Sequence, residues 1–273
     1  MTNEVARHYG GDGKLSDAIA QRLQRAGMSL DELKTVDLAS VDEFHIRGRK
    51  ATMELAAQMK LQRDSRVLDI GSGLGGPART IAEEYGCQVT GIDLTEAFCE
   101  AAQVMSGWVR LGERVAFQQG DATALPFESR QFDSALTVHV AMNIPDKDKM
   151  YQEARRVLKP GGIFAIYDVL QGEGGDVLFP VPWARESSLS HLASPEEMGS
   201  LLNDAGFKVL DVQDSSDESH DWFKAMRARI AESGTPAVTF QAFLGDDFPQ
   251  MVSNQVRNLA ERRIRTVSFI FEA

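Results

Sequence analysis

A glycine-rich segment and a following aspartate are the residues of this chain best suited to bind a cofactor. Gly71-Ser72-Gly73-Leu74-Gly75-Gly76 follows a short apolar run and satisfies the GxGxxG pattern, in which the absence of Cβ atoms lets a ligand approach the backbone. Asp93 stands about 20 residues further on, where a carboxylate can bind both ribose hydroxyls. These positions indicate an adenosine-containing cofactor. The alternative is a tight structural turn followed by a capping aspartate.

Asp69, two residues before the first glycine, helps to distinguish between the possible adenosine-containing cofactors. A carboxylate here would repel the pyrophosphate of NAD and attract a phosphate-free, cationic cofactor. Gly120-Asp121-Ala122 adds a carboxylate that can accept a hydrogen bond from an adenine amino group. The Tyr-x-x-x-Lys pair of short-chain dehydrogenases is absent, because Arg155 follows Tyr151 where the lysine would stand. A cationic cofactor is therefore favoured, and an NAD(P)-dependent oxidoreductase is the alternative.

From Arg66 onward, apolar runs alternate with stretches of helical periodicity. Because the runs are apolar on both faces, they predict a mostly parallel sheet with helices on both sides. Ligands of such sheets bind beyond the carboxyl ends of the strands. We therefore expect the site near Ile70, Ile92, Gln119, Val138 and Val169. The predicted strands are Arg66–Ile70, Gln88–Ile92, Val115–Gln119, Phe132–Val138, Ile163–Val169, Phe207–Val212 and an antiparallel Thr266–Phe271.

The sequence also predicts how the chain is divided into a cap, a main domain, a lid and an insertion. Residues 1–60 are expected to form an N-terminal helical cap, followed by a Rossmann-like domain over 61–273. Within that domain, 170–193 contains Gly and Pro without a clear period, which is typical of a lid or binding segment. Residues 215–263 are expected to form a helical insertion.

Short polar patterns predict where some elements begin and end. Ser29 with Glu32, and Ser194 with Glu197, match the capping box of a helix N-terminus. The polar run Asp211–Asp221 is expected to be a solvated strand end and loop.

The composition excludes several classes of protein. The chain has 273 residues, of which 43% are hydrophobic, too many for a disordered chain. No stretch approaches the roughly 20 apolar residues of a membrane-spanning helix, and the first 14 residues lack the apolar core of a secretory signal. Cys87 and Cys99 match no metal-binding spacing, so we expect no metal and a reducing, cytoplasmic setting. The formal net charge of −11 argues against nucleic-acid binding.

Five sequence runs together resemble the class I S-adenosylmethionine-dependent methyltransferases, over about residues 66–168. The runs are VLDIGSGLGGPAR, GIDLT, GDATALPF, FDSALTVHVAMNIPD and VLKPGGIFAIYD. The resemblance implies a Rossmann-like seven-stranded sheet with the last strand antiparallel, and S-adenosylmethionine as cofactor.

Two outer segments, DEFHIRGRKAT and VPWARESSLSHLASPEEMGSLLNDAGF, resemble a subgroup that acts on small molecules. This subgroup includes sarcosine/dimethylglycine N-methyltransferases and relatives acting on phosphoethanolamine, quinones and tocopherol. The likeness implies a small-molecule acceptor, first of all an amine. The alternatives are O- or C-methylation of a quinone, a phenol or another small metabolite, and a non-catalytic module that keeps the cofactor cleft.

The resemblance also assigns cofactor-binding residues. Asp69, Gly71 and Gly73 would hold the methionine part, with Ser72 as a further contact in the same loop. Ribose and adenine would lie on Asp93 and Leu94, the adenine edge on Asp121 and Ala122, and the methionine side on Thr137 and His139.

His139 and His45 are the candidate catalytic groups. Orientation of the acceptor can supply roughly 7–11 kcal/mol of barrier reduction, and a general base is needed only if the acceptor arrives protonated. A core histidine bonded to backbone is the alternative for both rings. Candidate acceptor contacts are Arg47, which replaces the first Gly of the subgroup's Gly-Gly pair, and Tyr167, Asp168, Trp183 and Arg185. For these the alternatives are a surface arginine, a loop cap or a packed lid residue.

The ribose assignment yields a direct prediction. Asp93→Ala should abolish cofactor affinity and leave the fold intact, because the variant loses the acceptor for the ribose hydroxyls. Calorimetry with S-adenosylhomocysteine and circular dichroism measure the two properties. Retained affinity would refute the assignment.

Overall fold

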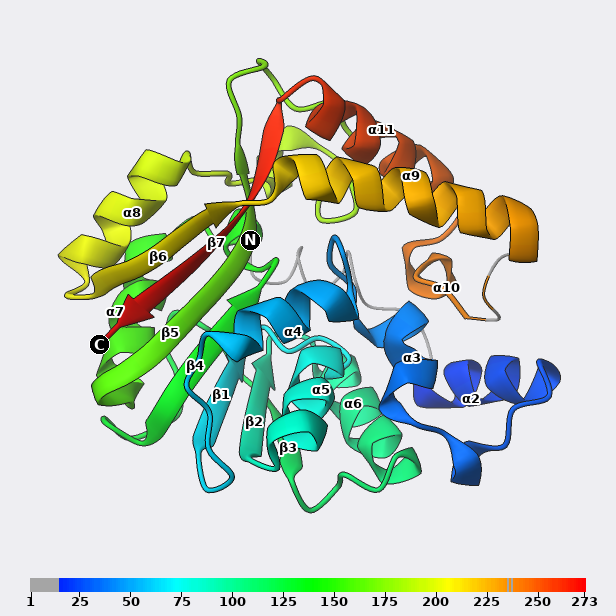
Figure 1. Cartoon of the computed structure of the whole chain (residues 1–273), viewed down its shortest axis with the longest axis horizontal. Helices are drawn as coiled ribbons and strands as arrows, with labels where there is room; N and C mark the ends of the chain where they lie inside the picture. The colour runs from blue at the N-terminus through cyan, green and yellow to red at the C-terminus, as the bar shows by residue number, and fades with distance from the viewer. Residues whose placement is uncertain (1–14, 235, 237) are drawn as a thin grey trace.

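The computed structural model, which describes residues 15–234, 236 and 238–273 apart from the side chains of Ala242 and Phe243, contains a seven-stranded sheet of order β3-β2-β1-β4-β5-β7-β6 (Figure 1). β7 runs antiparallel to β5 and β6, and the pairs among β1 to β5 are parallel. The predicted fold class is confirmed. The strands are β1 (Arg66–Ile70), β2 (Gln88–Asp93), β3 (Val115–Gln119), β4 (Phe132–Val138), β5 (Leu158–Gln171), β6 (Lys208–Asp214) and β7 (Ile264–Glu272).

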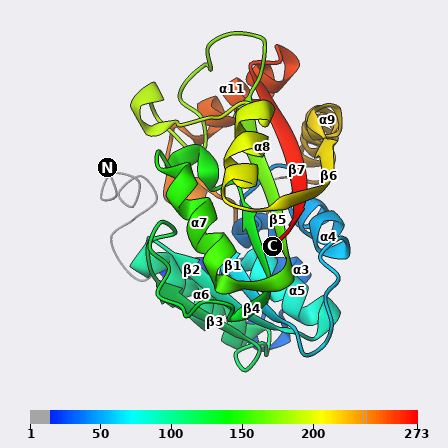
Figure 2. The same ribbon diagram turned by 90° about the vertical axis from the view of Figure 1, so that its left-hand side faces the viewer.

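Helices cover both faces of the sheet, as Figure 2 shows from the side. α7 and α8 pack on one face, and α4 and α5 pack on the other. The helices are α2 (Leu15–Arg25), α3 (Thr35–Asp42), α4 (Arg49–Ala57), α5 (Gly76–Tyr85), α6 (Glu96–Trp108), α7 (Lys147–Val157), α8 (Pro195–Asp204), α9 (Ser216–Ser233), α10 (Gln241–Leu244) and α11 (Phe248–Ala260).

The apolar strands produce this layering because successive side chains point to opposite faces. In β1, Leu68 belongs to the core under α7 and α8, whereas Val67 belongs to the core under α4 and α5. Both side chains are fully buried. Burial of such a side chain contributes about 1.5–3 kcal/mol.

The N-terminal helices are attached to the sheet domain through a buried ion pair. Arg79 of α5 is 0% exposed, and its guanidinium lies 2.7 Å from the carboxylate of Asp42 at the end of α3. Arg79 also donates to the carbonyl oxygen of Leu74 behind the glycine loop. These bonds connect α3 and the glycine loop through one side chain.

The segment between β5 and α8 packs with the C-terminal helices. Trp183 and Val181 form an apolar cluster with Phe223 of α9 and Leu259 of α11. Asn143 fastens this segment to the loop after β4, donating to the carbonyl oxygens of Trp183 and Leu189 at 2.8 and 3.1 Å.

Three local predictions are corrected or extended. Ser29 precedes a short 3-10 helix without a side-chain cap, so that capping box is absent. The polar run Asp211–Asp221 is a strand end as far as Asp214 but then becomes a helix, because α9 starts at Ser216 and buries Ser219 against Thr266 of β7, with 2.7 Å between the hydroxyls. Since serine is small enough for close packing, a polar sequence forms a buried helix face here. The short α10 was not predicted.

Other local predictions are confirmed. Ser194 and Glu197 form the predicted capping box at α8. β1, β3 and β4 have the predicted bounds, whereas β5 begins five residues before the predicted Ile163. The first 14 residues of the predicted N-terminal helical cap lie outside the described residues. In the described part of the chain, no helix is long and apolar enough to cross a membrane.

Candidate active site

A cavity of about 330 Å³ lies beyond the carboxyl ends of β1 to β4, where the site was expected. Gly71 follows β1, Asp93 ends β2, Gly120 follows β3 and Val138 ends β4; all four line the cavity. Val169, in β5, is not among the described lining residues. The turn after α3 and the 188–191 segment complete the walls. Both segments are distant in sequence from the strand ends they cover.

The glycine loop leaves room for a ligand on its cavity side. Gly71 has a φ of +77°, and a Cβ atom on it would lie 2.3 Å from Val140 Cγ2. Gly73 has a φ of +51°, but a Cβ atom there would meet nothing within 4 Å. Gly71 N donates to the carbonyl oxygen of Ile92 at 2.7 Å, which fixes the loop on β2. The open space beside Gly73 is therefore a cradle that a cofactor can occupy.

Asp93 joins the glycine loop to the turn after β2. Its Oδ2 accepts from the backbone N–H of Gly73 at 2.8 Å, and its Oδ1 accepts from the N–H of Thr95 at 2.9 Å. A carboxylate has about four acceptor sites, so both oxygens keep acceptor capacity. The arrangement can receive two hydroxyl groups of a ribose.

Asp69 is buried at 1% exposure and lines the cavity. Its Oδ2 has no hydrogen-bond partner among the described residues. Burial, and then the negative charges of Glu43 and Asp93, raise the pKa of Asp69 to about 8. An orphaned carboxylate oxygen of this kind gains a partner when a cation binds.

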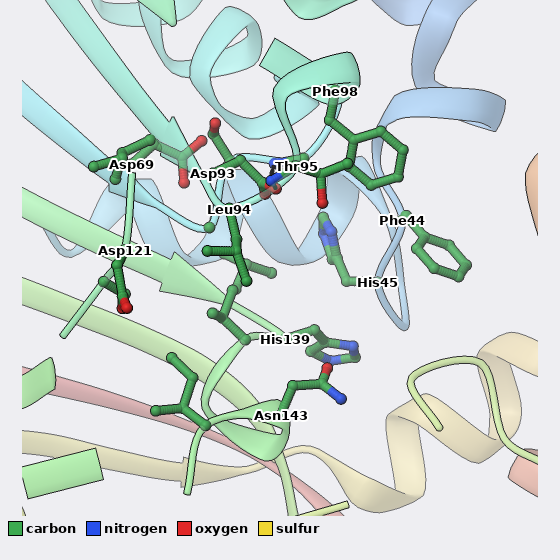
Figure 3. A pocket seen from close by; sticks show the side chains of 18 of the residues that line it. Phe44, His45, Asp69, Asp93, Leu94, Thr95, Phe98, Asp121, His139 and Asn143 are labelled. Carbon is green, nitrogen blue, oxygen red and sulfur yellow. Dashed lines mark hydrogen bonds between the residues drawn. The ribbon is translucent and has the colours of Figure 1, made fainter. Parts of the chain in front are cut away.

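The described lining of the cavity is acidic. It carries five carboxylates and no lysine or arginine, and its three histidines are His45, His139 and His191. Such a lining repels a pyrophosphate and attracts ammonium and sulfonium groups. Figure 3 shows Asp69, Asp93 and Asp121 on one side of the cavity and the two inner histidines on the other. The five carboxylates belong to Asp42, Asp69, Asp93, Asp121 and Asp146.

His45 and His139 face one another, with ring centroids 5.8 Å apart (Figure 3). His45 lies between α3 and α4, and His139 follows β4 with a left-handed φ of +55°. Burial lowers the pKa of His45 to about 4, and burial followed by the charge of His45 lowers that of His139. Both rings are therefore neutral at pH 7.

A second chamber of about 100 Å³ shares Phe44, His45 and His139 with the first cavity. No Asp, Glu, Lys or Arg is among the described residues that line this chamber. Its lining consists of Phe44, His45, Ile46, His139, Met142, Pro182, Trp183, Trp222, Phe223, Met226, Phe240, Phe248, Val252 and Gln255.

The structure brings most of the predicted cofactor residues together. Thr137 is the exception, because it is fully buried beneath the cavity and outside its described lining. Those that line the first cavity are Asp69, Gly71, Ser72, Gly73, Asp93, Leu94, Asp121, Ala122 and His139.

Four of the predicted acceptor contacts lie outside both cavities and have other partners. Arg47 pairs with Glu54, and Arg185 pairs with Asp247. Tyr167 lies 3.3 Å from the Ser219 hydroxyl. Asp168 caps a loop, accepting from the backbone N–H groups of Ala141 and Val169 at 2.9 Å each. The alternative of a loop cap is therefore the better description of Asp168.

Arg47 has a φ of +68°, the left-handed conformation in which glycine is most comfortable. The glycine that the resemblance expects at this position would adopt this conformation without strain. Trp183 is 2% exposed, donates to Ser190 Oγ at 3.0 Å and lines the chamber. It is both a packed residue and a chamber wall.

Several lining residues are not predicted by any pattern named above. Asp42, Phe44, Thr95, Phe98 and Asn143 all line the first cavity. Thr95 and Phe98 follow the acidic end of β2 directly, so their proximity to Asp93 was a usable signal. Phe44 precedes His45 and could have been found in the same way.

Three comparisons show what the chain is similar to. Residues 68–166 match the sequence model of a methyltransferase domain. O-methyltransferase resE of Aspergillus sclerotiorum is 30% identical over 186 residues, which are 66% of this chain and 69% of that protein. Sterol 24-C-methyltransferase ERG6B of Gibberella zeae is 37% identical over 116 residues, 42% of this chain and 30% of that protein.

A solved structure has the same fold. Phosphoethanolamine N-methyltransferase 2 of Haemonchus contortus, in complex with S-adenosyl-L-methionine, gives a TM-score of 0.71 at 23% identity, with 92% of this chain and 59% of that chain covered. With the relatives above, the chain belongs to the class I S-adenosylmethionine-dependent methyltransferases. Its cofactor is S-adenosylmethionine, the methyl donor of this family. The acidic lining, the open cradle at Gly73 and the orphaned oxygen of Asp69 fit this cofactor.

The raised pKa of Asp69 predicts that cofactor binding releases a proton. Near pH 7 the free carboxyl is largely protonated, since its pKa is about 8. A bound ammonium favours the ionised form, so affinity should rise as pH approaches 8, and about one proton should be released at pH 7. Calorimetry with S-adenosylhomocysteine in buffers of different ionisation enthalpy measures this number.

Asp69→Asn is the matched control for that titration, because it keeps the shape of the side chain without the proton. It should bind more weakly and release little or no proton. An unchanged proton release in Asp69→Asn would mean that another group supplies it.

Proposed function

We propose that this methyltransferase acts on a small, uncharged and largely apolar acceptor with a hydroxyl or similar weakly acidic group. The acidic cavity would hold the cofactor, and the chamber behind His45 and His139 would hold the acceptor. The observation that carries this proposal is the chamber lining, which combines aromatic and aliphatic side chains with no charged group. Apolar pockets with a few polar groups are typical of sites for small, apolar ligands.

The predicted amine acceptor is less well supported by this lining. An ammonium or zwitterionic acceptor would lose its hydration in the chamber without gaining a carboxylate or arginine partner, which is costly. Asp168 and Arg185, expected to bind such charges, have other partners outside the chamber. O-methylation or C-methylation of a phenol, a quinol or another small metabolite is therefore the preferred reading.

The names of the relatives are compatible with this preference. One is an O-methyltransferase and another is a sterol 24-C-methyltransferase. The structural relative named for phosphoethanolamine N-methylation supports a small-molecule acceptor, while its identity of 23% supports the fold and not the acceptor.

The residues of the chain have distinct parts in the proposed reaction. When bound, S-adenosylmethionine supplies a methyl group already activated on a sulfonium, so orientation of the acceptor and exclusion of water matter most. Asp93 would hold the ribose and Asp69 the ammonium. Asn143, through its two bonds to the 183–189 segment, would keep the cavity wall in place. His45 and His139 stand where the two spaces meet.

A cytoplasmic location is part of the proposal. It is supported by the two cysteines, Cys87 and Cys99, which are both free and buried. Unpaired thiols are typical of reducing compartments.

A matched panel of acceptors tests the proposed acceptor class. The purified protein is incubated with S-adenosylmethionine and equal concentrations of phenols, quinols, apolar alcohols, sarcosine, dimethylglycine and phosphoethanolamine, and mass spectrometry records the gain of one methyl group. We expect methylated products from the uncharged hydroxyl compounds. In Trp222→Ala the KM for such an acceptor should rise about tenfold or more, with unchanged affinity for S-adenosylhomocysteine. Methylation confined to the charged amines would overturn the proposal.

A further inference from the structure

Glu43 is a buried carboxylate that has no role in the reaction proposed above. It lies in the turn after α3 and is 2% exposed. One of its oxygens accepts from the hydroxyl of Thr80 at 2.6 Å, and the other accepts from the hydroxyl of Thr52 at 2.7 Å. Burial raises the pKa of Glu43, and the bonds from the two hydroxyls oppose that rise. On the ionised carboxylate both hydroxyl protons point to Glu43. A buried carboxylate held by two hydroxyl groups is costly to assemble, which raises the question of what it orients.

The hydroxyl of Thr52 also contacts His45. Its Oγ1 lies 3.2 Å from His45 Nε2, and the carbonyl oxygen of Gly48 lies 2.9 Å from the same nitrogen. A carbonyl oxygen can only accept a hydrogen bond, and the proton of Thr52 is already directed to Glu43. Nε2 thus faces two acceptors, and the hydrogen of the neutral ring belongs on Nε2. The lone pair of the ring is then on Nδ1.

The other nitrogen of His45 is unengaged. Nδ1 has no hydrogen bond among the described residues, and the ring lines both the cofactor cavity and the apolar chamber. His139 differs, because its Nε2 is buried without a partner and its ring packs 5.1 Å from that of Tyr167. No described hydrogen bond sets the tautomer of His139. Of the two rings, His45 is the one held in a defined state.

We propose that Glu43, acting through Thr52, is a positioning residue that holds His45 with its hydrogen on Nε2 and presents Nδ1 as the base for the acceptor. This inference rests on the proposed function. The O–H bond of the acceptor breaks as an N–H bond forms at Nδ1. The electron pair stays on oxygen and bonds to the methyl carbon, while the pair of the broken carbon–sulfur bond stays on sulfur.

The same carboxylate stabilises the product of that proton transfer. Glu43 Oε2 lies 3.6 Å from His45 Nε2, so a positive charge that develops on the ring meets a negative charge at short range. Asp42 acts on the ring in the same direction, and Arg47 opposes it. Burial lowers the pKa of His45 to about 4, so Nδ1 keeps its lone pair at neutral pH.

A spectroscopic experiment tests the tautomer without any acceptor. Nitrogen-15 NMR of protein labelled at histidine distinguishes a protonated from an unprotonated ring nitrogen, and loss of signals in His45→Gln assigns them. We expect protonated Nε2 and unprotonated Nδ1 in the unmodified protein. In Glu43→Gln the side-chain amide can donate to Thr52 and turn its hydroxyl toward His45. Thr52 then competes with the carbonyl oxygen of Gly48 at Nε2, so the form with the hydrogen on Nδ1 should appear beside the other form. A hydrogen on Nδ1 in the unmodified protein would overturn the inference.

Kinetics with a methylated acceptor from the panel separate positioning from a general loss of structure. Thr52→Val removes the hydroxyl that connects Glu43 to His45. Its matched control, Thr80→Val, removes the bond to the other oxygen of Glu43 and the bond from Arg49, and it leaves Thr52 in place. We expect kcat to fall about tenfold or more in Glu43→Gln and Thr52→Val, within the 10²–10⁴-fold that a general base supplies. KM should be unchanged in both, Thr52→Ser should restore kcat, and Thr80→Val should keep it.

A double variant completes the test. If Glu43 acts through His45, Glu43→Gln combined with His45→Gln should be no slower than His45→Gln alone. Additive losses, or equal losses in Thr52→Val and Thr80→Val, would contradict the inference. If the panel yields no methylated hydroxyl compound, the proposed acceptor class fails, and the NMR result still decides whether Glu43 holds the His45 tautomer.

Discussion

The acidic lining over the carboxyl ends of the strands is the constraint on which the rest of the site depends. Carboxylates from α3, β1, β2 and two later loops face one cavity, and no described arginine or lysine side chain lines it. This concentration of negative charge is unfavourable, and fixed partners stabilise some of the carboxylates. Two backbone N–H groups donate to Asp93, and Arg79 donates to Asp42. Asp69 keeps an unsatisfied oxygen. A cationic ligand relieves the repulsion, whereas a phosphate would meet no lysine or arginine among the described lining residues.

The second feature of the site is a sharp change of environment over a short distance. The cofactor cavity is polar and acidic, and the chamber that adjoins it is apolar and uncharged in its described lining. His45 and His139 stand at the boundary, and both are neutral because they are buried. A neutral histidine at such a boundary can receive a proton from an apolar acceptor. The carboxylates on the acidic side then stabilise the positive charge that develops on the ring. The division into two environments therefore follows from where α3, α4 and the C-terminal helices cover the sheet.

The sheet and the cofactor loop could be predicted from the sequence because their signals are local. β1, β3 and β4 are short runs that carry apolar residues such as Leu68, Phe117 and Leu136, the glycine loop follows β1 directly, and Asp93 ends β2. The acceptor side could not be predicted in the same way, since its walls come from segments distant in sequence. Asp168 and Arg185 were expected there by residue type, but backbone N–H groups and Asp247 bind them elsewhere. No local pattern indicated a role for Glu43, because that role depends on its hydrogen bonds to Thr52 and Thr80, which belong to two different helices.

The central claim is that the cavity accepts a phosphate-free, cationic adenosine ligand and rejects a dinucleotide. Calorimetric titration of the protein with S-adenosylmethionine and, separately, with NAD tests this claim most directly. We expect saturable binding of one S-adenosylmethionine per chain and no measurable heat of binding with NAD. Saturable binding of NAD with none of S-adenosylmethionine would contradict the account.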